Sequence, residues 1–399
     1  MARKTKEVYV KLYDSAGIFL KIDVNVQFEG FVKTINGGLG PLQLRFARKF
    51  DTFNEDNDLS IGNQLKLYVS DEDAFDVLMY SGRIEEQSPV IDGDTEYVDI
   101  VAYGWANQFN QDILKYGNRT TFYTDSTSTF VTASPSTKTT ELADVVRKIL
   151  EYFNLANDSL IRINSNVSGT DQVEDTGNGL EYSFTAMTYF EALEKCRLFS
   201  PQSWYWYLNA NNILEFKPKP SIATHSFVLK KDIKSIRAHK TLSQTKNIVI
   251  ASDGTTLYRK YSDETSISLY GRRVQLYVDS AIGGTSTMNR YGESFVNTNK
   301  NSFTKIELEI LDSNGNDVGY DIDSIEPGDT CKILNLEDTS EVLGNNMLIT
   351  EVHWTPGLAR LVIELNDFDI GKYLTRLKKE VEDNKKSDTG FPSYYTEQS

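Results

Sequence analysis

Short segments in which apolar and polar residues alternate recur along most of the 399-residue chain, and they leave few folds open. The segments are rich in Val, Ile, Thr and aromatic residues, with 22 Tyr and 20 Phe against only 9 Pro. Alternation gives each segment one apolar face, as in a β-strand that is buried on one side. In the first third of the chain, Gly- and Asp-rich turns separate predicted strands at 9–13, 19–24, 43–47, 64–69, 77–80 and 97–103. This close spacing is typical of a β-barrel or β-sandwich.

The middle of the chain changes from strand to helix periodicity. After a Ser/Thr-rich connector at 116–138, apolar residues at helical spacing predict a helix over 140–155; they are Leu142, Val145, Val146, Ile149, Leu150 and Phe153. Thr188 and Glu191 form a capping-box pattern that predicts a second helix, which runs to Leu198. A hairpin is expected next, with strands at 204–208 and 213–216. Residues 116–222 are therefore predicted to form a small α+β domain.

Strand patterning returns after Lys217-Pro218-Lys219-Pro220, because proline does not continue a central strand. Asp253-Gly254 and Asn314-Gly315 are typical of tight turns, and a short helix is expected at 287–300. The predicted fold is mainly β with an α+β insertion. Two β-barrel-like modules, at 1–115 and 223–369, flank the α+β domain at 116–222, and a C-terminal amphipathic helix and polar tail occupy 370–399.

Two short segments resemble each other across the chain. Ile61-Gly62-Asn63-Gln64-Leu65-Lys66-Leu67 and Pro327-Gly328-Asp329-Thr330-Cys331-Lys332-Ile333 each enter an alternating strand through a Gly-Asn or Gly-Asp turn. Two further predicted strands follow each segment. A β-rich chain can offer such a match by chance. The alternative is a duplicated β-module on either side of the α+β domain.

Length and charge exclude several classes of protein. The 399 residues are enough for two or three domains, and no apolar run approaches the ~20 residues that span a bilayer. Residues 1–7 are basic and no apolar signal segment follows them, so we expect synthesis in a cytoplasm. The net charge of −15, from 57 acidic and 42 basic residues, would repel nucleic-acid phosphates and anionic lipid. We expect neither an integral membrane protein nor a sequence-independent DNA-binding protein.

The residue types that serve most enzymes are scarce. His225, His239 and His353 are widely spaced and match no local metal-binding or catalytic motif. Cys196 and Cys331 lie in no CxxC spacing, so they are interpreted as core cysteines of a protein from a reducing compartment.

Two local motifs also fail as binding sites. The Gly-rich segment 37–41 lacks the Lys-Ser/Thr of a phosphate-binding loop, so a hairpin or loop is predicted there. Residues 312–317 copy the first ligand positions of a calcium loop, but Asp317 stands where that loop needs Gly. The sequence therefore predicts no catalytic, cofactor or metal site.

The aromatic run Trp204-Tyr205-Trp206-Tyr207 has two interpretations. Alternation places Trp204 and Trp206 on one face of the strand and the tyrosines on the other. The tryptophans could form a platform on which a sugar stacks, or they could pack into a core beneath the two helices. The core interpretation is favoured.

A series of motifs stands in an order that resembles the tail hub proteins of bacteriophages. These include the baseplate hub of contractile-tailed phages and the N-terminal region of tail-associated lysins of siphophages. The motifs are Tyr103-Gly104-Trp105, the helix after the Thr-rich connector, the aromatic hairpin, Phe216-Lys217-Pro218-Lys219-Pro220, Tyr270-Gly271-Arg272-Arg273 and Ser324-Ile325-Glu326-Pro327-Gly328-Asp329. The resemblance covers about residues 30–370 and carries no catalytic motif.

The resemblance implies a homotrimer in which two barrel domains per subunit form a pseudo-sixfold ring. Such a ring would join the tail tube or a distal tail protein to a threefold tip with its fibre or lysin. It would also frame the channel through which the genome DNA passes without specific binding. The resemblance implies a structural virion protein of the tail tip, assembled in the cytoplasm of the host bacterium, and the internal similarity fits that architecture.

One departure from the family concerns catalysis. Lysin-type relatives carry long extensions with peptidase or glycan-cleaving domains, whereas only a predicted helix and a short tail follow residue 370 here. We therefore expect a hub without a catalytic cycle. The alternative is a tail enzyme or module that binds or hydrolyses cell-wall glycan or peptidoglycan, which would need the aromatic hairpin and a carboxylate pair to converge in a cleft.

The C-terminal segment is a candidate docking element. Apolar residues at three- and four-residue steps mark one helix face, and aromatic residues interrupt the polar tail; they are Ile370, Tyr373, Leu374, Leu377 and Val381 in the helix and Phe391, Tyr394 and Tyr395 in the tail. The apolar seam is too short to be stable alone and needs a partner. That partner is either the second β-module of the same subunit or the next component of the tip.

Overall fold

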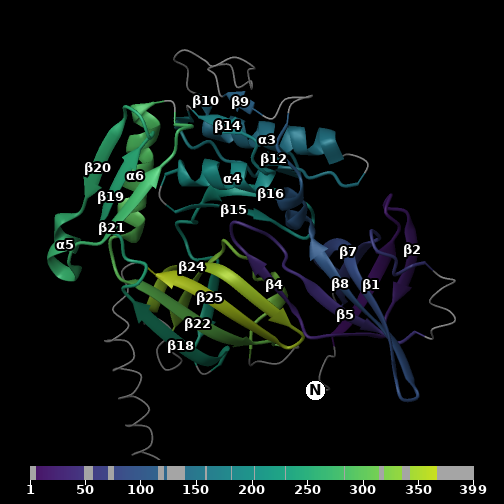
Figure 1. Cartoon of the computed structure of the whole chain (residues 1–399). Coiled ribbons are helices and arrows are strands. Elements are labelled where there is room, and N and C mark those ends of the chain that lie inside the picture. Colours follow the sequence, from purple (N-terminus) through teal and green to yellow (C-terminus); the bar gives the residue numbers. More distant parts are fainter. Residues whose placement is uncertain are drawn as a thin grey trace, which may run out of the picture.

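The computed structural model describes residues 6–48, 57–70, 76–115, 121–123, 140–157, 160–180, 182–201, 203–229, 231–282, 284–313, 319–334 and 342–365. Two large sheets lie side by side, and a layer of helices and short strands lies above them (Figure 1). The fold is mainly β, as predicted. The predicted C-terminal helix and tail, the connector at 116–138 except 121–123, and the Asn314-Gly315 turn lie outside the described residues.

The first sheet is built from the alternating segments near the N-terminus. Its strand order is β2-β1-β6-β7-β8-β5-β3, with antiparallel neighbours. The strands are β1 Glu7–Tyr13, β2 Phe19–Asp23, β3 Val26–Phe28, β5 Leu42–Phe46, β6 Gln64–Ser70, β7 Val77–Asp92 and β8 Thr95–Gly104. Apolar residues at every second position of β5 and β6 face the core, which is why alternation located these strands. β7 is much longer than predicted and forms a protruding hairpin with β8 (Figure 1).

The second sheet has the order β17-β23-β24-β25-β22-β18. Its strands are β17 His225–Val228, β18 Ile233–Thr241, β22 Phe303–Leu311, β23 Thr330–Leu334, β24 Val342–Thr355 and β25 Leu358–Leu365. The 3-10 helix η2, Ile322–Ser324, precedes β23. Buried residues of both sheets belong to one continuous hydrophobic cluster.

One strand of the N-terminal segment crosses to the second sheet. β4, Phe31–Thr34, pairs antiparallel with β24 from Glu351 to Trp354. After β4 the chain enters the Gly-rich segment 37–41, which is a loop as predicted. This loop packs closely against a distant part of the chain, since a Cβ at Gly38 would lie 2.9 Å from the Leu208 carbonyl oxygen. The predicted module boundary at residue 115 therefore does not separate the two sheets completely. The local sequence of a strand does not determine which strand it pairs with.

The predicted helices and hairpin of the α+β segment are present. Helix α3 spans Leu142–Asn157, and α4 spans Tyr189–Leu198 behind the predicted capping box of Thr188 and Glu191. The hairpin consists of β15 Trp204–Leu208 and β16 Leu214–Pro218. The smaller elements are η1 Trp105–Asn107, α2 Gln108–Gln111, β9 Thr121–Tyr123, β10 Thr140–Glu141, β11 Asn166–Val167, β12 Thr170–Asp171, β13 Gly179–Leu180 and β14 Ser183–Thr185.

A separate unit interrupts the second sheet between β18 and β22. It contains β19 Ile248–Ser252, β20 Tyr258–Ser262, α5 Glu264–Tyr270, β21 Val274–Val278 and α6 Thr285–Asn299. The turn at Asp253-Gly254 joins β19 to β20 as predicted, and α6 accounts for the predicted short helix. This insertion packs on the α+β segment and shares its hydrophobic cluster, so it lies outside the β-module in which the sequence placed it.

An acidic side chain ties the insertion to α4. Asp279 accepts hydrogen bonds on Oδ2 from Lys195 Nζ at 2.7 Å, Tyr277 Oη at 2.8 Å and Tyr182 Oη at 3.0 Å. Burial alone would raise the pKa of Asp279, but these hydrogen bonds and the charge of Lys195 lower it below its ordinary value.

The two large sheets repeat one topology. β1, β3, β5, β6, β7 and β8 correspond in chain order to β17, β18, β22, β23, β24 and β25, and each set stands in the same order across its sheet. The pairing direction differs at one place, because β1 and β6 are antiparallel whereas β17 and β23 are parallel.

The loops that enter β6 and β23 share their hydrogen bonds. The N–H of Gly62 donates to the carbonyl of Ile84 at 2.8 Å, and the N–H of Ile84 donates back to the residue after Gly62 at 2.8 Å. Gly328 and Ile349 make the same pair of bonds, at 2.8 and 2.9 Å. Both glycines have a φ of +95°, and a β-bulge follows both isoleucines. The similarity noticed in the sequence is therefore a duplication of the folded module.

Candidate assembly surfaces

The aromatic hairpin lies inside the molecule. Trp206 is buried against Phe190 and Phe109, with ring centroids 5.4 and 6.2 Å away, and its indole N–H donates to Glu194 Oε1 at 2.7 Å. Trp204 is half-buried and packs against Phe216. This packing agrees with the core interpretation, since a stacked sugar would need the ring faces that Trp206 buries.

The tyrosines of the hairpin face the second sheet. Tyr207 is buried, and its hydroxyl donates to Glu326 Oε2 at 2.6 Å. The buried ammonium of Lys33, on β4, donates to the other oxygen of Glu326 at 2.6 Å. A Cβ at Gly328 would lie 2.3 Å from the Tyr205 ring, whereas a Cβ at Gly62 would meet no atom within 4 Å. The hairpin therefore contacts the loop before β23 directly, and through Glu326 it is linked to Lys33 of the N-terminal segment.

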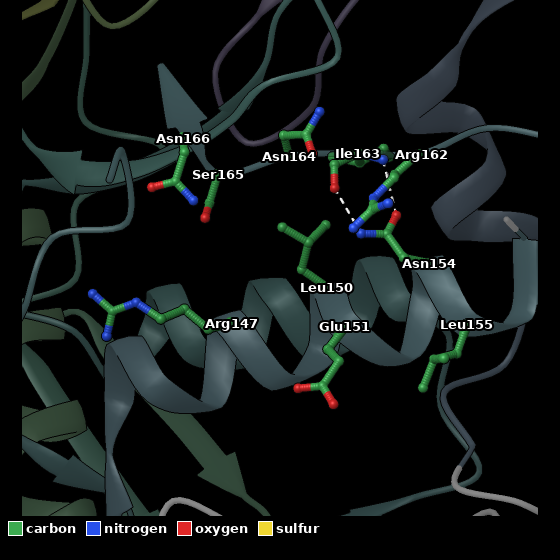
Figure 2. Close-up of a pocket in the computed structure, with 10 residues that line it drawn as sticks. All are labelled: Arg147, Leu150, Glu151, Asn154, Leu155, Arg162, Ile163, Asn164, Ser165 and Asn166. Carbon is green, nitrogen blue, oxygen red and sulfur yellow. Dashed lines mark hydrogen bonds between the residues drawn. The ribbon is translucent and has the colours of Figure 1, made fainter. Parts of the chain in front are cut away.

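A cleft of about 470 Å³ lies between α3 and residues 162–166 (Figure 2). Arg147 at its edge holds Asp144, Asp171 and Asp175 in ion pairs of 2.8, 2.8 and 3.0 Å. Burial alone would lower the pKa of Arg147, but the hydrogen bonds to these carboxylates raise it above its ordinary value. Asn154 exchanges hydrogen bonds with the backbone of Ile163 (Figure 2). Arg147 is thus held by carboxylates beside the cleft, and Asn154 is held by the backbone of its far wall.

The histidines and cysteines occupy separate structural positions. His225 is buried between Tyr320 and Asp329, at 3.0 Å from each, and the other two histidines lie on different strands. Cys196 and Cys331 are buried, and burial raises the pKa of both thiols well above the ordinary value. Within the described ranges, no group of three or more His, Cys, Asp or Glu residues is arranged to hold a metal ion. None of the described helices is both long and apolar enough to cross a bilayer.

Strands β2 and β21 lie at opposite ends of the molecule (Figure 1), and each carries exposed apolar side chains. The β2 surface consists of Ile18, Phe19, Leu20, Ile22 and Val24, of which Ile18 and Val24 are each 65% exposed. β2 ends the strand order of the first sheet, so among the described residues one of its edges has no partner strand. An exposed apolar edge of this kind is a template for association.

The second apolar surface lies on the insertion. The β21 surface consists of Val274, Leu276 and Val278, which share one face of β21 and are 44%, 61% and 55% exposed. Helix α6 covers the other face of this sheet (Figure 1). Sequence reasoning found neither surface. The one available signal was the apolar face formed by Ile18, Leu20, Ile22 and Val24. Alternation alone does not show that this face is left uncovered.

Charge also differs between the two ends. The β7–β8 hairpin carries six acidic and no basic residues between Glu85 and Asp99. Strand β18, at the far end of the second sheet, carries Lys234, Arg237, His239 and Lys240, all exposed, and no acidic residue. Glu85 and Asp99 of the hairpin pair with Arg83 and Arg45, so its acidic region is the outer part with Asp92, Asp94 and Glu96. Lys234 of β18 pairs with Glu309 of β22, which leaves Arg237, His239 and Lys240 as the exposed basic residues of that strand.

No protein-family model matches the chain, and no curated protein matches it by sequence. Solved structures with the same fold do exist. The 43 kDa tail protein of prophage MuSo2 from Shewanella oneidensis has a TM-score of 0.57 at 12% identity, over 90% of this chain and 98% of that one. A tail protein from Neisseria meningitidis MC58 has a TM-score of 0.56 at 10% identity, over 90% and 96%.

A third structure extends the likeness. Prophage tail protein gp18 from Listeria monocytogenes EGD-e has a TM-score of 0.50 at 10% identity, over 94% of this chain and 99% of that one. The likeness covers nearly the whole of each chain, so it includes both large sheets and the helical layer. At such low identity it concerns the path of the backbone and not the side chains. The resemblance seen in the sequence is confirmed at this level: the chain has the fold of phage tail proteins.

Proposed function

We propose that this protein is a structural component of a phage tail, a homotrimeric hub at the tail tip that joins the tail tube or a distal tail protein to the tip fibre or lysin. The fold is that of phage tail proteins. The observation that carries the proposal furthest is the duplication, in which two modules share their strand order and their loop hydrogen bonds.

Duplication suits a part that lies between different symmetries. Three copies of a chain with two similar modules present six similar blocks to a sixfold tube, and three chains to a threefold tip. The β7–β8 hairpin is acidic and β18 is basic, and a head-to-tail contact that closes into a ring joins two different surfaces of this kind. Such a ring would frame a channel for the genome, and acidic side chains on its wall would let DNA slide without binding.

Complementation in the phage tests this proposal. Particles made without the protein should lack a finished tail tip, and antibody labelling of wild-type particles should place the protein at the end of the tail in virions assembled in the host cytoplasm. Normal tails on particles that lack the protein would rule the role out.

The second candidate is a tail module that binds or cleaves cell-wall glycan. Trp204 is half-buried, and the polar cleft beside α3 is the place where a sugar would fit. A glycan array and an assay of hydrolysis of purified cell walls separate the candidates. The hub proposal predicts neither binding nor hydrolysis, and either activity would favour the glycan module.

The C-terminal segment keeps its proposed docking role. Ile370, Leu374, Leu377 and Val381 would pack on the hub, and the tail with Phe391, Tyr394 and Tyr395 would recruit the next tip component. Deletion of residues 387–399 should leave the hub oligomer intact and abolish that recruitment. Unchanged recruitment would show that the tail has no docking role.

A further inference from the structure

The two modules of one chain meet through different surfaces. Trp354, near the end of β24, is 1% exposed because the first module covers it. Phe28 of β3 and Phe31 of β4 contribute this cover, with ring centroids 6.1 and 5.6 Å from Trp354. The part of β24 that extends past β23 is thus buried by the β3–β4 side of the preceding module.

The duplication identifies the equivalent surface on the first module. Ile349 corresponds to Ile84, so Trp354 on β24 corresponds to Pro89 on β7. β6 pairs with β7 only as far as Arg83, and beyond this point β7 pairs only with β8 in the described part of the chain. Ser88 and Pro89 are exposed. The surface that is covered on the second module is therefore uncovered on the first.

The duplication also identifies the strand that could provide the cover. Phe28 pairs with Leu44 in β5, and the corresponding pair in the second module joins Ile236 of β18 to Leu308 of β22. β18 thus takes the place of β3. It stands last in its sheet among the described residues, and Arg237, His239 and Lys240 on it are exposed.

The contact within the chain and the two exposed surfaces both combine a basic side with an acidic side. Within the chain, Lys33 and Lys6 of the first module pair with Glu326 and Asp323 of the second, each at 2.6 Å. The exposed β18 is likewise basic, and the exposed β7–β8 hairpin is acidic, with Asp92 and Asp94 at its tip. Among the described residues, neither Arg237 nor Lys240 forms an ion pair, and Arg237 stands opposite Glu307 of β22.

We propose that β18 of one copy docks on the outer part of the β7–β8 hairpin of the next copy, and so repeats between chains the contact that joins the modules within a chain. This inference rests on the proposed ring and names its contact surface. Pro89 has no N–H to donate, so the contact forms through side chains and not through a continuous strand ladder. Opposite charge selects this head-to-tail order, because the copies otherwise repel one another.

Charge reversal tests the contact in solution, with native mass spectrometry of the full chain as the measurement. Arg237→Glu with Lys240→Glu, or Asp92→Lys with Asp94→Lys, should weaken the trimer by on the order of 100-fold at about 150 mM salt. A chain that carries all four changes should regain it, because the charges are again opposite. Lys148→Glu with Arg162→Glu, on and beside α3, is the matched control and should leave the trimer unchanged.

The outcomes separate this inference from the proposed function. A wild-type chain that stays monomeric at every concentration overturns the ring, and this contact with it. A stable wild-type trimer that the reversals leave intact overturns the contact alone. The contact is also contradicted if both double variants assemble weakly and the variant with all four changes does not regain the trimer. Restored opposite charges would then have failed to restore assembly, so the substitutions would have caused a general defect.

A cross-link gives an independent measurement. Both native cysteines are buried, so Ser88→Cys with Lys240→Cys places reactive thiols only at the proposed contact. Mild oxidation should produce dimers and trimers linked by disulfides, and Ser88→Cys with Arg162→Cys should not. Equal cross-linking of the two pairs would contradict the proposed contact.

Discussion

The pair formed by Lys33 and Glu326 makes a sharp test of what holds the two modules and the hairpin together. The Lys33 side chain is 1% exposed and the Glu326 side chain 37%, with the charged atoms 2.6 Å apart. At an effective dielectric constant of about 20, the attraction between them is about 6 kcal/mol before the cost of desolvation. Most of that cost falls on Lys33, because water still reaches Glu326.

Removing the two charges should therefore have unequal effects. Glu326→Gln leaves a buried ammonium without a counterion and should lower the free energy of unfolding by about 3 kcal/mol. Lys33→Met removes the buried charge, leaves Glu326 in water and its bond from Tyr207 intact, and should cost at most about 1 kcal/mol. The double variant should resemble Lys33→Met, because no unpaired buried charge remains.

Equilibrium unfolding in urea, followed by tryptophan fluorescence, measures all three variants. The control is the pair of half-buried Lys148 and exposed Glu151, at 2.5 Å, in which neither neutralisation should cost more than about 0.5 kcal/mol. Equal losses in Lys33→Met and Glu326→Gln would refute the idea that the unequal burial of the two charges decides the effect.

Three further predictions concern the duplicated loops, the insertion and the thiols. Gly62→Ala and Gly328→Ala both strain a φ of +95°, but only the second brings a Cβ within 2.3 Å of the Tyr205 ring. Gly328→Ala should therefore lower the free energy of unfolding in urea by at least about 2 kcal/mol more than Gly62→Ala, and equal losses would contradict this packing. Asp279 has a lowered pKa, so its stabilising effect should be full above the ordinary value of 3.8 and lost as pH falls below it. Asp279→Asn should make the free energy of unfolding depend less on pH between pH 5 and 2. An unchanged pH dependence would contradict the role given to the hydrogen bonds of Asp279. Cys196 and Cys331 should react with a thiol reagent at pH 8 only after unfolding, and rapid labelling of the native chain would show that they are not buried as described.

Local signals in the sequence predicted local structure well. The capping box of Thr188 and Glu191, the helical spacing before Phe153 and the alternation in the hairpin each act within a few residues, and each element is present. The two Gly-turn segments suggested the duplication without deciding it against chance, and the structure shows that both glycines meet the same demand for a positive φ.

Contacts between distant segments were not predictable in the same way. Residues 31–34 do not alternate, since Phe31 and Val32 are followed by Lys33 and Thr34, and nothing local shows that they pair with β24. The insertion after β18 has ordinary strand and helix patterns, but its place in the second hydrophobic cluster depends on partners far away in the chain. The exposed surfaces were missed for a related reason, since alternation identifies the two faces of a strand but not which of them another element covers.

The central claim is that two similar modules of this chain alternate around a closed ring at the end of a phage tail. A cryo-electron microscopy reconstruction of the purified oligomer, calculated without imposed symmetry, measures this most directly. The account predicts a particle three times the mass of the 45.2 kDa chain, with six related β-modules around a channel and β18 of each copy beside the β7–β8 hairpin of the next. A monomer, a ring of six chains, or a trimer whose modules do not alternate would contradict it.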